Sequence, residues 1–288
     1  MWRIAPSVLM FVLLWALPAA ARECDRACAG QAAETALAAL QTGQAGKVLP
    51  RGVRITENGR DIRLADSQLF AIRRVTARQT YSEPRAGAVG IIGAAEAYGG
   101  PAVFAIRVKL KGDRVSEIET LVVRRTEAQA FSPGTLRNLS VETPPKAVTV
   151  QSSRLDLIAL ANAWLDGFSG AAAGPEPVSL DCVLFDNGAR SPSSSACRDV
   201  AGLRGLIRDR RLALVDEEQG VVWAWAIVDH PEAIASAGRP GRSMARSVLL
   251  AARLRIDRGQ IQDIELVQRN LTFGATSGWT PPKPKKRT

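Results

Sequence analysis

Short motifs from the first half of the chain return in the second half in the same order, and this constrains the fold more than any other feature. An internal repeat is settled first, because missing it misassigns the whole architecture. The offset grows from 129 residues (57 to 186) to 146 residues (115 to 261), so the second copy carries insertions. The recurring motifs are Glu57-Asn58-Gly59 with Asp186-Asn187-Gly188, Arg78/Glu83/Gly87 with Arg211/Asp216/Gly220, and Val115-Ser116-Glu117-Ile118-Glu119 with Ile261-Gln262-Asp263-Ile264-Glu265.

Each copy begins with a helical pattern and continues with strand patterns. Alanines and leucines from Ala32 to Leu40 predict a helix in the first copy, and Ser152 or Ser153 caps one in the second. Apolar residues then alternate with other residues over 104–111 and again over 248–256, as in a sheet with one buried face. We therefore expect an α+β fold of two tandem cone-shaped units. In each unit helices would pack against a curled antiparallel sheet, and the two units would form an internal pseudo-dimer.

The N-terminus has the pattern of a secretory signal. Arg3 gives a basic start, Val8 to Leu17 an apolar core, and Ala19 to Ala21 a cleavage site. The alternative is an uncleaved anchor, but Pro6 and Pro18 confine the apolar run to fewer than the roughly 20 residues that a span needs. We expect a periplasmic or secreted protein with no stable membrane insertion after cleavage. The predicted boundaries are a signal peptide at 1–21, a first unit at 22–130, a linker at 131–153, a second unit at 154–280 and a basic disordered tail at 281–288.

The four cysteines are disulfide candidates once export is assumed. Cys182 and Cys197 bracket a Ser/Pro-rich loop, and closing such a loop is worth about 3 kcal/mol. Cys24 and Cys28 lie four residues apart, which favours a local staple over a redox or metal pair. The chain has a single histidine, so a Cys/His zinc site and other metal sites are not expected.

The formal net charge of +10 raises the question of nucleic-acid binding. The arginines are interleaved with acids, and only residues 283–287 form a basic cluster, so we expect no nucleic-acid partner. The sequence has no phosphate-binding glycine loop, no Gly-x-Ser-x-Gly elbow and no zinc signature, so we expect no cofactor and neither a hydrolase nor a nucleotide enzyme.

Several of these segments resemble exported, largely uncharacterised SnoaL-like (NTF2-like) proteins. The resemblance rests on residues 53–59, 115–124, 215–220 and 229–231, and on the closing Thr276-Ser277-Gly278-Trp279. It implies a cone fold with a cavity between the helices and the sheet. Members of this fold include isomerases, dehydratases, cyclases and plain binding modules, so the resemblance does not decide the function.

His230, the only histidine, begins a loop that is longer in the second copy and is the first candidate for acid–base chemistry. Asp229 beside it, or Glu265 across the sheet, would assist. A structural turn at Asp229-His230-Pro231 is the alternative.

Trp223 and Trp225 share one strand face and would line a substrate pocket, with Arg246, Arg253 or Arg255 available to an anionic group; burial in an interface is the alternative. The acids Glu117/Glu119 and Asp263/Glu265 would be either pocket carboxylates or cross-strand partners of arginines. The leading hypothesis is an exported pocket protein that acts as a cofactor-free isomerase or lyase on a small organic molecule. The alternative is a non-catalytic ligand-binding or envelope protein-interaction module. A homodimer remains open.

Overall fold

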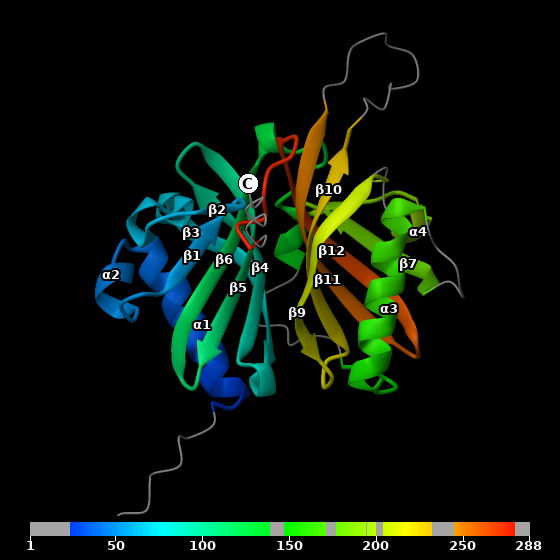
Figure 1. The fold of residues 1–288 in the computed structure, drawn as a ribbon, viewed down its shortest axis with the longest axis horizontal. Helices are drawn as coiled ribbons and strands as arrows, with labels where there is room; N and C mark the ends of the chain where they lie inside the picture. Colours follow the sequence, from blue (N-terminus) through cyan, green and yellow to red (C-terminus); the bar gives the residue numbers. More distant parts are fainter. Residues whose placement is uncertain are drawn as a thin grey trace, which may run out of the picture.

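The protein consists mainly of two six-stranded sheets that pack face to face, as the computed structural model shows (Figure 1). The structure describes residues 24–138, 147–170, 177–193, 195–199, 204–231 and 245–279. The first sheet has the order β2-β1-β6-β5-β4-β3 and the second has the order β8-β7-β12-β11-β10-β9. The strands of the first sheet are β1 (Arg54–Glu57), β2 (Arg60–Asp61), β3 (Ile72–Glu83), β4 (Ala88–Ala97), β5 (Gly100–Lys111) and β6 (Arg114–Arg124). Those of the second are β7 (Val178–Asp186), β8 (Ala189–Arg190), β9 (Leu206–Asp216), β10 (Val221–His230), β11 (Arg246–Asp257) and β12 (Gln260–Thr272).

One long helix lies on the outer face of each sheet, at opposite sides of the molecule (Figure 1). Asp25 caps α1 (Arg26–Gln41), where its carboxylate accepts a hydrogen bond from the amide of Cys28. Ser153 caps α3 (Arg154–Asp166) in the same way through the amide of Asp156. The shorter helices are α2 (Ala45–Val48), α4 (Ala196–Asp199) and the 3-10 turns η1 (Leu64–Asp66), η2 (Gln68–Ala71), η3 (Pro84–Ala86), η4 (Arg125–Glu127), η5 (Thr135–Asn138) and η6 (Gly167–Ser169).

Both sheets combine an antiparallel meander with one parallel pairing. Strands β3 to β6 and β9 to β12 pair antiparallel in succession, while β1 lies parallel to β6 and β7 lies parallel to β12. The Asn-Gly turns at residues 58–59 and 187–188 join β1 to β2 and β7 to β8. All four residues have positive φ, as a two-residue hairpin turn demands.

The buried residues form three layers. One apolar cluster lies between α1 and the first sheet, a second lies between α3 and the second sheet, and a third lies between the two sheets. Consequently β4 and β10 are buried on both faces: all residues from Ala88 to Ala95 and from Val221 to Val228 are buried. Strands buried on both faces are expected to be continuously apolar, as these are.

The expectation of helices packed against curled cone-shaped sheets in a tandem pseudo-dimer is wrong. The fold is mostly β, with two six-stranded sheets, and among the described residues only α1 and α3 exceed four residues. The physical reason is that the inner face of each sheet is covered by the other sheet and not by helices, so the strands supply most of the buried surface. The alternation in residues 104–111 and 248–256 identified strands correctly, but it did not show that both faces are covered.

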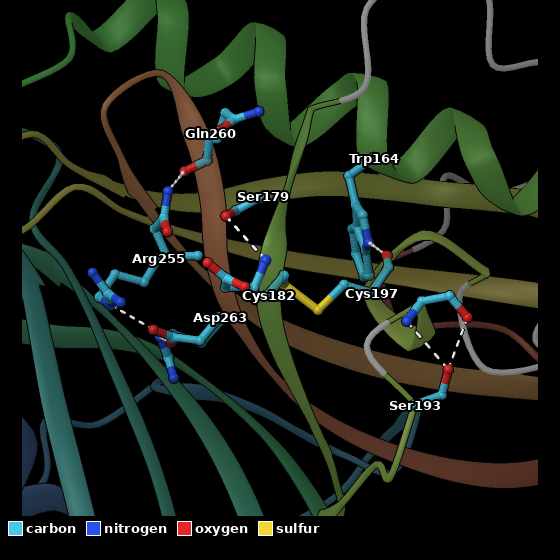
Figure 2. Close-up of a disulfide and its surroundings, with 12 residues drawn as sticks. Trp164, Ser179, Cys182, Ser193, Cys197, Arg255, Gln260 and Asp263 are labelled. Carbon is cyan, nitrogen blue, oxygen red and sulfur yellow. Dashed lines mark hydrogen bonds and ion pairs between the residues drawn. A yellow bond between two sulfur atoms is a disulfide. The ribbon is translucent and has the colours of Figure 1, made fainter.

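Both disulfides predicted from the sequence are present. Cys24 bonds Cys28 at the start of α1, and Cys182 of β7 bonds Cys197 of α4 (Figure 2). The carbonyl of Cys197 also accepts a hydrogen bond from Trp164 Nε1 at 3.0 Å, so this bridge ties β7 to the helix layer. The predicted signal peptide, the centre of the predicted linker (139–146), the loop at 232–244 and the tail lie outside the described residues.

Each sheet is completed by a segment that follows the last strand of the other half. The segment after β6 reaches the second sheet, where the amide of Ser132 donates to the carbonyl of Asn187 at 3.0 Å. The segment after β12 reaches the first sheet, where Thr276 Oγ1 donates to the carbonyl of Gly59 at 3.4 Å. Figure 1 shows this C-terminal segment in red, lying against the first half of the chain. We call residues 125–138 and 273–279 the crossing segments.

Candidate functional site

A cavity of about 710 Å³ lies between the two sheets. Strands β7, β11 and β12 of the second sheet, β3 of the first sheet and the crossing segment at η5 contribute its walls. Its size falls within the range of small-molecule sites, which are mostly apolar clefts with a few convergent polar groups. The residues that line it are Gln79, Tyr81, Thr135, Leu136, Asp181, Val183, Phe185, Arg190, Gln219, Val221, Arg253, Arg255, Gln262, Asp263 and Glu265.

The floor of this cavity is a buried ionic cluster centred on Arg253. Its guanidinium binds Asp263 through Nη1 and reaches Glu265 Oε2 from Nε at 3.2 Å. Arg255 binds the same Asp263, as the close-up in Figure 2 shows. Arg253 lies opposite Glu265 and Arg255 opposite Asp263 in the β11–β12 ladder, so neighbouring positions on two strands place all four charges on one face.

The two acids of the cluster, Asp263 and Glu265, differ in the number of arginines that they bind. Asp263 has two arginines, which outweigh its burial and lower the pKa of its carboxyl. Burial raises the pKa of Glu265, and Arg253 offsets only part of that effect. The Oε1 atom of Glu265 has no hydrogen-bond partner in the part of the chain that the structure describes. The same is true of the amide oxygen of Gln219, another residue of the cavity wall. Both unpaired atoms are acceptors.

The walls above this floor combine apolar side chains with polar ones, among them Asp181, Arg190 and Gln262. Phe185, Val183 and Leu136 come from β7 and the crossing segment. The Tyr81 ring lies 5.9 Å from the guanidinium carbon of Arg253, and its hydroxyl donates to Gln79. The arrangement suits a ligand with an apolar body and one polar end.

The first sheet carries a corresponding cluster, and there the space is filled by the protein itself. Arg107 lies opposite Glu119 in the β5–β6 ladder and binds it at 3.1 Å and Glu117 at 2.8 Å. Arg211 of β9 then crosses from the second sheet and binds both oxygens of Glu119, with one contact at 3.0 Å. The Trp279 ring covers this cluster, 4.8 Å from the guanidinium carbon of Arg107 and 5.6 Å from that of Arg211.

The structure places the predicted pocket tryptophans in the core between the sheets. Trp223 and Trp225 are 1% and 0% exposed, and neither lines the cavity. Trp223 packs 6.1 Å from the Tyr81 ring and against Gly90, where an added Cβ would lie 2.6 Å from the indole. They thus occupy the interface position that the sequence left as the alternative.

The three predicted residues around the lengthened loop gather at the far end of β10. His230 is 3% exposed and faces the helix side, opposite Arg246 on β11. Burial and Arg246 lower the pKa of His230, and its Nε2 has no partner among the described residues. Asp229 points to the other face, where Arg208 Nε and Ser247 Oγ bind it at 2.6 Å each.

His230 and Glu265 do not share a site. Glu265 pairs across the ladder with Arg253, which in turn lies opposite Trp223, seven residues before His230 on β10. At about 3.3 Å per residue the two levels are about 23 Å apart. Among the residues named from the sequence, Asp263, Glu265, Arg253 and Arg255 line the cavity. The residues that sequence reasoning missed are Tyr81, Thr135 and Gln219, which no local pattern connects to β11 and β12.

A second groove, of about 750 Å³, lies where β3 and β9 end, and many of the residues that line it are charged. Its acids have partners: Arg26 binds the buried Asp216 at 2.6 Å, and Arg154 binds Glu83. These ion pairs link α1 to the second sheet and α3 to the first, so the charges of the groove are paired within the protein.

Comparison with known proteins gives few matches. Residues 150–267 match a family described as a domain of unknown function (DUF8021), over less than half of the chain. No curated protein matches. AusH from Aspergillus nidulans matches with a TM-score of 0.31 and 15% identity, over 40% of this chain and 85% of its own. AclR from Streptomyces galilaeus matches with a TM-score of 0.30 and 15% identity, over 46% of this chain and 91% of its own.

Proposed function

We propose that the protein binds a small organic molecule in the cavity between its sheets. The observation that carries the proposal is the buried ionic floor of a cavity with a partly apolar wall, in which Glu265 has one carboxylate oxygen without a hydrogen-bond partner. A buried acceptor without a partner costs about 1–3 kcal/mol, and a ligand donor would recover part of that cost. Each charge on the floor has a close partner of opposite sign, but Glu265 meets its partner Arg253 through Oε2 alone.

The isomerase or lyase reaction expected from the sequence stays a prediction. In this cavity Glu265, and not His230, would be the acid–base group, because its buried carboxyl has a raised pKa and lines the space. A reaction that needs both residues is disfavoured by their separation along β10. Binding is therefore the more direct conclusion from the geometry.

The test is a substitution that places a large side chain from the wall of the cavity into the ligand space. Thr135 lines the cavity, so Thr135→Trp should occupy the ligand space, whereas Thr135→Ser leaves it open. We would screen small aromatic cations, neutral amides and acids by thermal shift against the parent and both variants. A ligand at a hundredfold excess over its Kd stabilises the native state by about 2.7 kcal/mol. A hit kept by Thr135→Ser and lost in Thr135→Trp supports the site. No hit in the whole screen, or hits indifferent to Thr135→Trp, would refute it.

We also propose that this binding takes place outside the cytosol. Both disulfides belong to the class that persists in oxidising compartments, and the N-terminal pattern is that of a signal peptide. Among the described residues, no helix is long and apolar enough to cross a membrane. Fractionation of the source cells with an antibody to the protein decides between periplasmic, secreted and cytosolic locations.

A further inference from the structure

We infer that the ligand of this cavity carries a planar nitrogen cation, an amidinium or guanidinium group on an apolar body, that binds Glu265. The inference rests on the proposed function and adds the class of ligand. In the corresponding cluster of the first sheet, the guanidinium of Arg211 binds both oxygens of Glu119.

The Arg107–Glu119 cluster and the Arg253–Glu265 cluster have the same arrangement, except that Glu265 lacks the second arginine that Glu119 has. Arg107 reaches Glu119 Oε2 from Nε at 3.1 Å, and Arg253 reaches Glu265 Oε2 from Nε at 3.2 Å. Glu119 is then bound on both oxygens by the guanidinium of Arg211, while Glu265 Oε1 has no partner in the described part of the chain. A planar pair of N–H donors is the group that fits a carboxylate at both oxygens.

The chain does not supply that group to Glu265 from the first sheet. Arg78 takes the place of Arg211 in the sequence motif shared by the two halves, but its Nε binds Glu34 of α1 at 3.0 Å. Tyr81 and Gln79 face the cavity instead, and the Tyr81 hydroxyl donates to Gln79. Arg190 of β8 also lines the cavity, but it forms no hydrogen bond with Glu265 Oε1. Among the described residues no second cation binds Glu265, and we assign that role to the ligand.

The space above the cluster is open for a related reason. An added Cβ on Gly59 would lie 2.4 Å from the carbonyl oxygen of Thr276, and one on Gly188 would lie 2.4 Å from that of Ser132. The two crossing segments thus meet corresponding turns at Thr276 and Ser132. Three residues further along, one segment places Trp279 over its cluster and the other places Thr135, which is much smaller.

The residues beside the two clusters also differ, and those in the second sheet favour contact with an apolar ring of a ligand. Trp279 is held by Arg54, whose guanidinium carbon lies 3.9 Å from the ring, and by Thr56, which accepts from its Nε1 at 2.9 Å. Counting along the shared Glu/Asp-Asn-Gly motif, the matching positions in the second sheet are Val183 and Phe185, which line the cavity. The polar side chains that hold the indole in the first sheet are thus replaced by two apolar side chains in the second sheet.

An anionic end is the competing class, and the pairing on the floor disfavours it. Arg253 is bound to both Asp263 and Glu265, and Arg255 is bound to Asp263. On the floor, a carboxylate ligand would have to displace one of these partners or approach the unpaired Glu265 oxygen. The other arginine of the cavity, Arg190, lies on an exposed part of the wall and not on the floor. The two unpaired buried acceptors, Glu265 Oε1 and the Gln219 amide oxygen, both call for donors.

Three small molecules of similar shape test which charge the ligand carries. Benzamidine, benzamide and benzoate share a planar ring and differ in bearing a cation, a neutral amide or an anion. We would measure the Kd of each by titration calorimetry on the full chain, on Glu265→Gln and on Asp181→Asn. Asp181 is an exposed acid that also lines the cavity, so it is the matched control for a nonspecific attraction of cations. We expect benzamidine to bind at least tenfold more tightly than benzamide, and benzoate to bind least.

The outcomes separate this inference from the function it rests on. Glu265→Gln should abolish the preference for benzamidine, and Asp181→Asn should keep it. Tighter binding of benzoate or benzamide, lost in Thr135→Trp, would overturn the ligand class and leave the binding site standing. A benzamidine preference that disappears in Asp181→Asn but survives Glu265→Gln would also overturn it. If all three probes fail and the wider screen gives no hit, both proposals fall.

Discussion

Replacing Arg211 with alanine should destabilise the whole molecule, because this one side chain joins the two sheets through a buried acid. Glu119 is 2% exposed, and Arg211 binds both of its oxygens from the opposite sheet. After the substitution Glu119 keeps only Arg107, at 3.1 Å. Breaking a buried ion pair by removing one partner costs about 3–5 kcal/mol.

We take the lower end of that range, because the Arg211 side chain is 27% exposed and water can replace part of its interaction. A loss of about 3 kcal/mol in a chain of this size corresponds to a fall in Tm of about 6–12 °C. The neighbouring Arg210 is the matched control. It pairs with Asp166 at the surface, where both side chains are at least a third exposed, and Arg210→Ala should cost under about 1 kcal/mol.

The assay is thermal and urea unfolding followed by tryptophan fluorescence for the parent, Arg211→Ala, Arg210→Ala and the double variant Glu119→Gln/Arg211→Ala. The double variant removes the buried charge that the single variant leaves unpaired, so it should regain about half of the lost stability. Equal melting of the two arginine variants would refute the assigned role of Arg211. A double variant no more stable than Arg211→Ala would show that unpaired buried charge is not the cause.

Three further perturbations follow from features of the fold. Removing the Cys182–Cys197 bridge by a double alanine substitution should cost about 3 kcal/mol from loop entropy, measured by urea unfolding, and an unchanged midpoint contradicts this. Gly90→Ala should cost at least about 1–3 kcal/mol, because the new methyl would lie 2.6 Å from the rigid indole of Trp223; a neutral effect on the midpoint would mean that the interface relaxes. Burial raises the pKa of Asp186 to about 7, so its proton stabilises the fold at low pH and that contribution is lost as pH rises from about 4 through 7. Asp186→Asn should therefore raise the midpoint more at pH 8 than at pH 5, and an equal gain at both would exclude titration of this group.

Local patterns predicted much of the secondary structure, while contacts between distant residues could not be read from them. The alternation over residues 104–111 placed β5, and the repeated acids Glu117 and Glu119 were expected as cross-strand partners of arginines, as Arg107 shows. The pairs Cys24–Cys28 and Cys182–Cys197 were predicted from spacing and compartment.

The parts that sequence reasoning got wrong or missed depend on which surfaces meet. The apolar run of β10 gave no indication that one of its faces lies on a sheet and the other on a helix. Arg211 reaches Glu119 across 92 residues and Tyr81 contacts Arg253 across 172 residues, and no spacing rule links such pairs. The single histidine drew attention to the end of β10, whereas the open cavity lies at the level of Glu265.

The crossing segments have a consequence for how the chain acquires its structure. The turn at Gly59 is among the first parts of the sheets to be made, but the Thr276 backbone that packs against it is made after the entire second sheet. During synthesis the Arg107 cluster of the first sheet therefore stays uncovered until Trp279 has been made. Each sheet is covered in part by a segment that follows the other sheet in the chain. The two sheets should therefore unfold together. Amide hydrogen exchange would then report one shared opening free energy for the strands of both sheets.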